Sequence, residues 1–140
     1  MLHLFHPALV HFSVAFIVTG GCAELWGLAY RQERSIRWGT TLTLAGLASL
    51  VPTLASGYLA ANTLDVPAAV QPLLDSHERN GWILLGVLCG AQFWKAWCGG
   101  RVPDGSRWLY AALMASAVGL AAYGAWLGGR MVYGAGLGVG

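Results

Sequence analysis

Long stretches with no charged residue, or only one, constrain the fold of this chain more than any other feature. A helix needs about 20 apolar residues to cross a membrane. Four stretches reach or approach that length: residues 7–30, 38–61, 80–97 and 108–127. Backbone groups cannot remain unpaired in lipid, and these runs are too long and continuous for barrel strands, so we predict helices. The predicted fold class is all-α: a single-domain polytopic membrane protein, an antiparallel bundle of four transmembrane helices.

The composition excludes several other classes of protein. Only 10 % of the 140 residues are charged, against about 25 % in soluble domains, and the mean hydropathy is +0.57. These charges are too few for the surface of a soluble enzyme. Three cysteines without a C-x-x-C pair indicate neither a zinc site nor a disulfide framework. The chain has no run rich in Lys and Arg, so we expect no nucleic-acid partner.

The basic residues predict which side of the membrane each connection occupies. Six of the eight lie in or beside the short connections that follow the first and third runs: Arg31, Arg34, Arg37, Lys95, Arg101 and Arg107. The positive-inside rule places these connections in the cytoplasm. The expected location is therefore a bacterial inner (cytoplasmic) membrane, crossed several times, with both termini and residues 62–76 in the periplasm.

Glycine and proline suggest how the helices pack. Pro52 predicts a kink in the second helix, and Gly128-Gly129 is expected to end the fourth. Two pairs, Gly86-x-x-x-Gly90 and Gly124-x-x-x-Gly128, have the spacing at which small residues let membrane helices approach closely. We therefore predict helix contacts at both pairs.

A few polar residues interrupt the apolar runs. Glu24 could serve as a proton-relay carboxylate, or could pair with Arg31 or Lys95, and we favour the pairing. The third run reaches Trp97 if Lys95 extends its amine toward the membrane surface. Gln92 and the threonines of 40–43 are expected to form hydrogen bonds between helices.

All four histidines lie near the predicted periplasmic side. His6 and His11 frame the sequence His6-Pro7-Ala8-Leu9-Val10-His11-Phe12, His77 precedes the third run, and His3 is most simply a capping or surface residue. In an antiparallel bundle the first and third helices start at the same level. His6, His11 and His77 are therefore expected to converge.

His11 is the most informative of these residues. It lies about 7 Å deeper than His6, from a rise of roughly 1.5 Å per residue. An ionisable side chain at that depth is expected to face the bundle interior and to have a partner. His6 and His11 are about 140° apart around the helix, so at most one of them pairs with His77. We predict His11 and His77 as metal ligands, with His6 and His77 as the second choice.

Two histidines on facing helices indicate a haem, because this is the usual way in which a membrane bundle stores an electron. Neutral imidazole is a good iron ligand, and a dry interior tunes the reduction potential. Arg79 could neutralise a propionate of a b-type haem at the periplasmic surface. Copper or zinc could use the same imidazoles.

Sequences at both ends of the chain resemble a known family. The opening His6–Phe12, the position of His77 and the closing sequence Gly128–Val139 resemble the bacterial four-helix membrane family catalogued as domain of unknown function 2231. The resemblance covers the whole chain. Members of that family occur beside redox proteins such as Rieske iron–sulfur proteins, which implies electron transfer. This chain has Ser13 where the family usually has Pro, and Arg130 where the closing sequence is usually acidic.

These features predict a b-type haem-binding subunit that transfers electrons near the periplasmic side of a respiratory or photosynthetic complex. With little chain outside the membrane, we expect no independent catalytic activity. The expected partners are the lipid bilayer, other membrane subunits of the redox complex and a periplasmic electron carrier. The alternative is a non-redox structural or assembly subunit, whose histidines only stabilise the bundle.

Overall fold

The computed structural model describes residues 5–63 and 65–137, and within them every regular element is helical. The long helices are α1 (Phe5–Tyr30), α2 (Glu33–Thr63), α3 (Gln71–Trp97) and α4 (Arg107–Gly129). A short 3-10 helix, η2 (Asp104–Ser106), precedes α4, and a π-helical turn, η3 (Arg130–Gly134), follows it. The predicted all-α class is confirmed.

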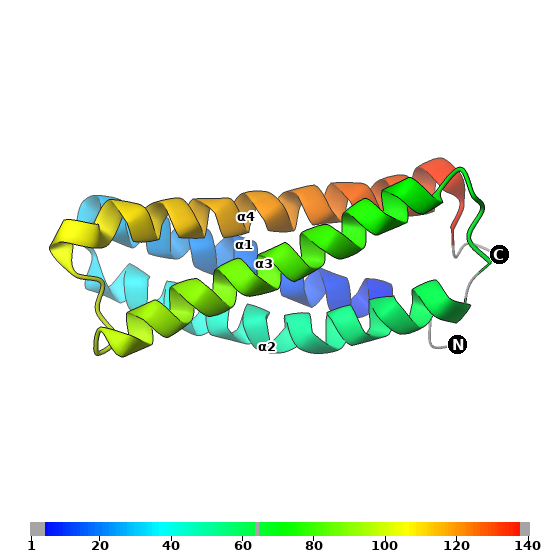
Figure 1. The fold of residues 1–140 in the computed structure, drawn as a ribbon. Helices are drawn as coiled ribbons and strands as arrows, with labels where there is room; N and C mark the ends of the chain where they lie inside the picture. The colour runs from blue at the N-terminus through cyan, green and yellow to red at the C-terminus, as the bar shows by residue number, and fades with distance from the viewer. Residues whose placement is uncertain (1–4, 64, 138–140) are drawn as a thin grey trace.

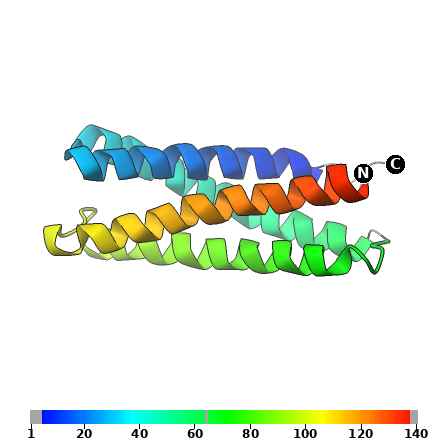
Figure 2. The ribbon, with the colours of Figure 1, turned by 90° about the horizontal axis from the view of Figure 1, so that it is seen from above.

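The four long helices lie side by side, each antiparallel to the one before it (Figures 1 and 2). One end of the bundle carries the two-residue turn Arg31–Gln32 and the loop before α4, and we call it the hairpin end. The opposite end carries the first turns of α1 and α3, with His6 and His77, and we call it the histidine end. Chain direction alone therefore brings these two histidines to the same end of the molecule.

Three segments are long and apolar enough to cross a membrane: His6–Tyr30, Glu33–Thr63 and Asp104–Gly134. They contain α1, α2 and α4. Helix α3 has sufficient length, at 27 residues, but it is less apolar than the other three. The polar residues of α3 account for its lower hydropathy.

The largest change in a predicted boundary is at α3, which begins at Gln71 and not near Asn80. The first turns of α3 are polar but still helical. Pro72 suits a first helical turn, where a missing N–H costs little, and Gln71 Nε2 donates to Asp75 Oδ1 at 2.9 Å. An apolar run shows which part of a helix can lie in lipid. It does not show where the helix begins or ends. Helix α2 continues through Pro52 to Thr63.

The backbones of α1 and α2 are in direct contact at glycines. A Cβ on Gly39 would lie 2.6 Å from the backbone nitrogen of Glu24, and one on Gly20 would lie 2.7 Å from that of Thr43. Gly27 and Gly46 occupy similar positions, each seven residues from the glycine on its own helix. Such close approach lets membrane helices associate through van der Waals contact.

The predicted glycine pairs behave differently from each other. A Cβ on Gly86 or Gly90 would have no neighbour within 4 Å among the described residues, so the prediction of a contact there within the chain is wrong. Gly124 and Gly128 do lie against α3, beneath the side chains of Asn80 and His77. The Gly-x-x-x-Gly spacing therefore predicted one of the two contacts correctly. It did not indicate the glycine contacts between α1 and α2.

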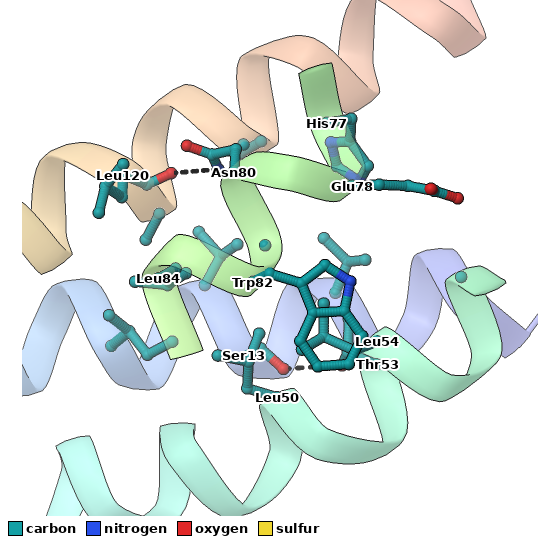
Figure 3. A pocket seen from close by; sticks show the side chains of 18 of the residues that line it. Ser13, Leu50, Thr53, Leu54, His77, Glu78, Asn80, Trp82, Leu84 and Leu120 are labelled. Atoms are coloured by element: carbon teal, nitrogen blue, oxygen red, sulfur yellow. Dashed lines mark hydrogen bonds between the residues drawn. The ribbon is translucent and has the colours of Figure 1, made fainter. Parts of the chain in front are cut away.

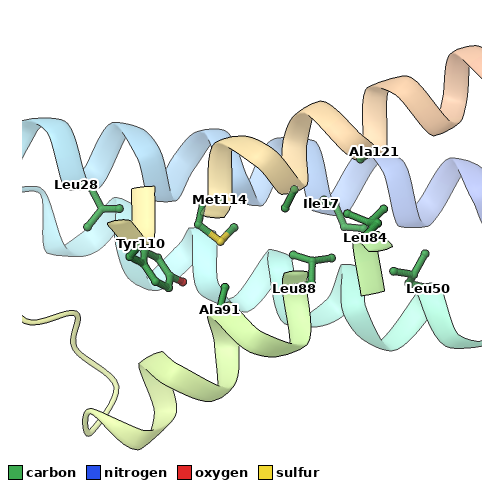
Figure 4. Close-up of a cluster of buried hydrophobic side chains, with 10 residues drawn as sticks. Ile17, Leu28, Leu50, Leu84, Leu88, Ala91, Tyr110, Met114 and Ala121 are labelled. Carbon is green, nitrogen blue, oxygen red and sulfur yellow. The ribbon is translucent and has the colours of Figure 1, made fainter. Parts of the chain in front are cut away.

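A row of buried apolar side chains fills the middle of the bundle (Figure 4). The labelled members include Ile17, Leu50, Leu84, Leu88 and Met114, with at least one from each long helix. Their packing separates a polar cluster at the hairpin end from a cleft at the histidine end. These two regions are the candidates for function.

Candidate functional site

The histidine end contains a cleft lined by all four long helices, which we call the histidine cleft. Its polar lining residues are His6, Ser13, Thr53, Tyr58, His77, Glu78 and Asn80. The cleft has a volume of about 80 Å³. Figure 3 shows Thr53 and Leu54 of α2 and His77 and Trp82 of α3 around it. Tyr58 and Trp82 are more than half exposed, so the cleft opens between α2 and α3.

His6 is held against α2 in a defined tautomer. Its Nδ1 lies 3.1 Å from the carbonyl oxygen of Thr53 and 3.0 Å from Ser56 Oγ. A carbonyl can only accept, and the Ser56 hydroxyl itself donates to the Thr53 carbonyl. Nδ1 must therefore carry the proton, which leaves the lone pair on Nε2. Metal-binding histidines commonly have this arrangement, with the second nitrogen donating to a carbonyl.

Gly57 provides the space for the His6 ring. A Cβ at position 57 would lie 2.8 Å from His6 Cε1 and 3.5 Å from His6 Nε2. The imidazole therefore rests directly against the backbone of α2. A side chain at this position would displace the ring.

His77 faces His6 from α3. The two ring centroids are 6.4 Å apart and the rings are nearly perpendicular, at 86°. Nδ1 of His77 is buried and has no hydrogen-bond partner among the described residues. One turn further along α3, Asn80 Nδ2 donates to the carbonyl of Leu120 at 3.0 Å, which fixes this part of α3 against α4.

The structure does not bring His11 to His77. The His11 side chain is exposed, and its Nδ1 bonds only to the carbonyl of Pro7 on its own helix. The prediction that it faces the interior is wrong because α1 turns another face inward, with His6, Ser13, Ile17, Gly20 and Glu24. His11 is two residues from Ser13, about 200° around the helix. The second-choice pair, His6 and His77, is the one that comes together.

Arg79 is the remaining residue of the predicted site. Arg79 is exposed and does not line the histidine cleft, because it follows His77 by two residues and lies on the opposite face of α3. Glu78 lines the cleft instead, so the nearest charge is negative. His3 lies outside the described residues.

Sequence analysis missed a chain of hydroxyl groups below His6. Ser13 Oγ lies 3.1 Å from Ser49 Oγ and 2.8 Å from Thr53 Oγ1, which links α1 to α2 (Figure 3). The spacing of Ser49, Thr53 and Ser56 at four and three residues, on one helical face, is the signal that could have found it. These hydroxyls form a polar layer beneath the histidine cleft.

A second polar cluster is buried near the hairpin end around Glu24, which we call the Glu24 cluster. Glu24 Oε2 accepts from Lys95 Nζ at 2.9 Å and from the Tyr110 hydroxyl at 2.7 Å. Its Oε1 accepts from Thr43 at 2.8 Å and from Gln92 at 3.4 Å. Thr40 also accepts from Lys95. All four long helices contribute.

The predicted pairing of Glu24 with Lys95 is confirmed, and so are the interhelical hydrogen bonds of Gln92 and Thr43. Lys95 does not extend toward the membrane surface. Only 4 % of its surface is exposed, because the buried Glu24 carboxylate would otherwise lack a counter-charge. Glu24 is itself fully buried.

The chemistry of the two regions differs. Four donors occupy the Glu24 carboxylate, which favours a fixed ion pair over a proton relay. His6 and His77 instead line the cleft, and each has an imidazole nitrogen without a hydrogen-bond partner among the described residues. No group of three or more His, Cys, Asp or Glu side chains in the described residues could hold a metal ion. An ion in the histidine cleft would therefore have two imidazole ligands and draw its other ligands from a cofactor.

Four long helices, three of them apolar enough to cross a membrane, define a helical membrane protein that carries a two-imidazole cleft at one end. A family model of predicted membrane proteins, domain of unknown function 2231, matches residues 2–140, so the chain belongs to that family. No curated protein and no solved structure matches it.

Proposed function

We propose that the chain is a membrane electron-transfer subunit that binds b-type haem between His6 and His77. The observation that carries the proposal is the pair itself: two imidazoles from different helices, 6.4 Å apart, beside a cleft. His6 and His77 would hold the iron through their imidazole nitrogens, which form metal bonds of about 2 Å. Two rings arranged around such an ion have centroids at about this separation.

The size of the cleft restricts how a haem would lie. The cleft has a volume of about 80 Å³, well below the usual range for cofactor sites, about 300–1,000 Å³. A haem would therefore need the side chains around the opening between α2 and α3 to move. Leu54 and Trp82 would move aside to admit it.

The residues of this chain would hold and tune the cofactor, and the iron would store one electron by changing between ferric and ferrous. Thr53 and Ser56 fix His6 with Nε2 free, and their hydrogen bonds to Nδ1 raise its basicity as a ligand. The apolar lining excludes water. Since Arg79 is outside the cleft and Glu78 lines it, no Lys or Arg side chain of the described lining would offset the charge of the propionates.

We further propose that α3 is a fourth transmembrane span. Its polar residues Asn80, Gln92 and Lys95 are all at least nine-tenths buried inside the bundle. From residue 81 onward its exposed large side chains are apolar or aromatic: Trp82, Ile83, Phe93 and Trp97. The surface that α3 presents to lipid is therefore apolar, and its lower hydropathy comes from residues that lipid does not contact.

The charges favour an orientation with the hairpin end in the cytoplasm of a bacterium and the histidine end at the periplasmic face of the inner membrane. His77 and Lys95 are 18 residues apart on α3, about 27 Å along the helix. One haem near His77 would therefore exchange electrons on the periplasmic side only, with a periplasmic carrier or with other membrane subunits of a redox complex.

The test is to purify the chain from cells supplied with iron and a haem precursor, and to record its absorption spectrum. We expect a Soret band and a bis-histidine low-spin signal, both lost in His6→Ala and His77→Ala. His11→Ala is the matched control, because its imidazole is exposed, and it should keep the full haem content. A chain without pigment, or loss in His11→Ala alone, would contradict the proposal.

The hydrogen bonds of His6 to Thr53 and Ser56 favour one alternative, a structural subunit whose histidines only join helices. That role predicts that His6→Ala lowers stability or assembly and that no variant changes pigment. Loss of pigment with the fold intact would instead support haem binding.

A further inference from the structure

We propose that the last part of α2, residues 53–63, is a gate that opens the histidine cleft by bending at Pro52. The proposal deepens the proposed function, since it describes how a cofactor larger than the closed cleft is admitted. The bending itself does not depend on which cofactor binds.

Pro52 lies at the boundary between two differently held parts of α2. Proline has no N–H, so the carbonyl of Ala48 loses its helical hydrogen bond, and helices bend at such positions. Before Pro52, the backbone of α2 is pressed against α1 at Gly39 and Gly46, and Thr43 belongs to the Glu24 cluster. That part cannot move without breaking the buried cluster.

After Pro52, α2 is held much more lightly. Among the described residues, its polar links to α1 lie at the start of the segment, from Thr53 Oγ1 to Ser13 and from the Thr53 carbonyl and Ser56 to His6. Among the described residues, no side-chain hydrogen bond joins residues 53–63 to α3. The segment therefore faces α3 through apolar contact alone.

A single side chain closes much of the opening. Leu54 packs against the bare backbone of Gly81, where a Cβ would lie 2.7 Å from Leu54 Cδ2. Leu54, Gly57 and Tyr58 line one side of the cleft, and Gly81 and Trp82 line the other. Outward bending of residues 53–63 would separate these two sides without disturbing the core at Leu84 and Leu88.

The first experiment locks the gate. In a chain with the three native cysteines replaced by serine, Leu54→Cys and Gly81→Cys are joined by a short bifunctional thiol reagent, and haemin is titrated into the purified protein. Only open chains should bind, so we expect uptake of haemin to slow about tenfold or more. The control joins Gly21→Cys to Val118→Cys, which links α1 to α4 outside the cleft, and should leave uptake unchanged. Equal uptake by locked and unlocked chains would overturn the gate.

The second experiment needs no cofactor. Spin labels on Leu59→Cys of α2 and Ile83→Cys of α3, both about half exposed, report the distance across the opening. We expect a broad distribution with a long-distance population that Pro52→Ala removes. The same distribution in both chains would overturn the gate. If the unlocked chain binds no haemin but Pro52→Ala still narrows the distribution, the haem proposal fails and the gate stands.

Discussion

The two ends of the bundle treat buried polar groups in opposite ways. At the hairpin end, Glu24 and Lys95 are almost completely buried, and each oxygen of the carboxylate accepts two hydrogen bonds. At the histidine end, a buried nitrogen of His77 has no partner in the described part of the chain, and empty space lies beside it. One end is a completed network, and the other is an incomplete one.

The difference indicates where the chain has kept capacity for a ligand. A satisfied buried network contributes to a unique arrangement of helices, whereas an unsatisfied one lowers stability and persists where it has a use. Depth in the membrane does not separate the two regions, since both lie within the bundle. The two regions differ instead in the number of hydrogen-bond donors and acceptors that have no partner.

The largest effect is expected on breaking the ion pair at the hairpin end. Glu24→Ala leaves the Lys95 ammonium buried without its counter-charge, and this should cost about 3–5 kcal/mol of unfolding free energy. Titration of the purified protein with a denaturing detergent, followed by circular dichroism, measures the loss. Replacing both residues together, Glu24→Gln with Lys95→Met, should recover most of it, because no uncompensated charge remains.

The control for this change is Glu33→Ala. Glu33 pairs with Arg37 at 3.7 Å on the surface, where both side chains are largely exposed, and exposed pairs contribute little. We expect no measurable change. If Glu24→Ala were equally neutral, the contrast between the two ends of the bundle would be lost.

A smaller effect is expected from adding a methyl group between α1 and α2. In Gly39→Ala the new Cβ would lie 2.6 Å from backbone of Glu24, so the helices must separate, at a cost of about 1–3 kcal/mol. The matched control is Gly86→Ala, whose Cβ meets no described atom within 4 Å and which should be neutral or slightly stabilising. Both are measured in the same detergent titration, and equal effects would show that the backbone contact is not tight.

The smallest effect has the opposite sign. Replacing His77 by Leu removes a buried nitrogen that has no partner, so the cofactor-free chain should gain about 1 kcal/mol. The same variant should bind no haem. Thermal unfolding of the cofactor-free protein measures the gain, and a loss of 2 kcal/mol or more would mean that His77 has a structural partner after all.

The sequence was sufficient to predict the helices, because an uncharged run of membrane length has few other solutions. It also predicted the pairing of Glu24 with Lys95, since an isolated charge at that depth requires a partner. Boundaries such as Gln71 could not be predicted in the same way. Polar turns outside the apolar run continue a helix without any change in the pattern that marks it.

The face that each helix turns inward was much harder to predict. Helix α1 is apolar on all sides, because both lipid and the core accept apolar residues, so periodicity did not distinguish His6 from His11. The better signal was the alignment of Ser13, Gly20 and Glu24, small or polar residues that lipid would not favour. Following that line toward the start of the helix reaches His6.

The close glycine contacts of α1 and α2 have a consequence for the order of assembly. A two-residue turn and a backbone interface need nothing from the later half of the chain, so this hairpin can form while α3 and α4 are still being synthesised. The imidazole of His6 would then already be hydrogen-bonded to the Thr53 carbonyl before His77 is in place. Half of the site is a product of early folding, and the arrival of α3 completes it.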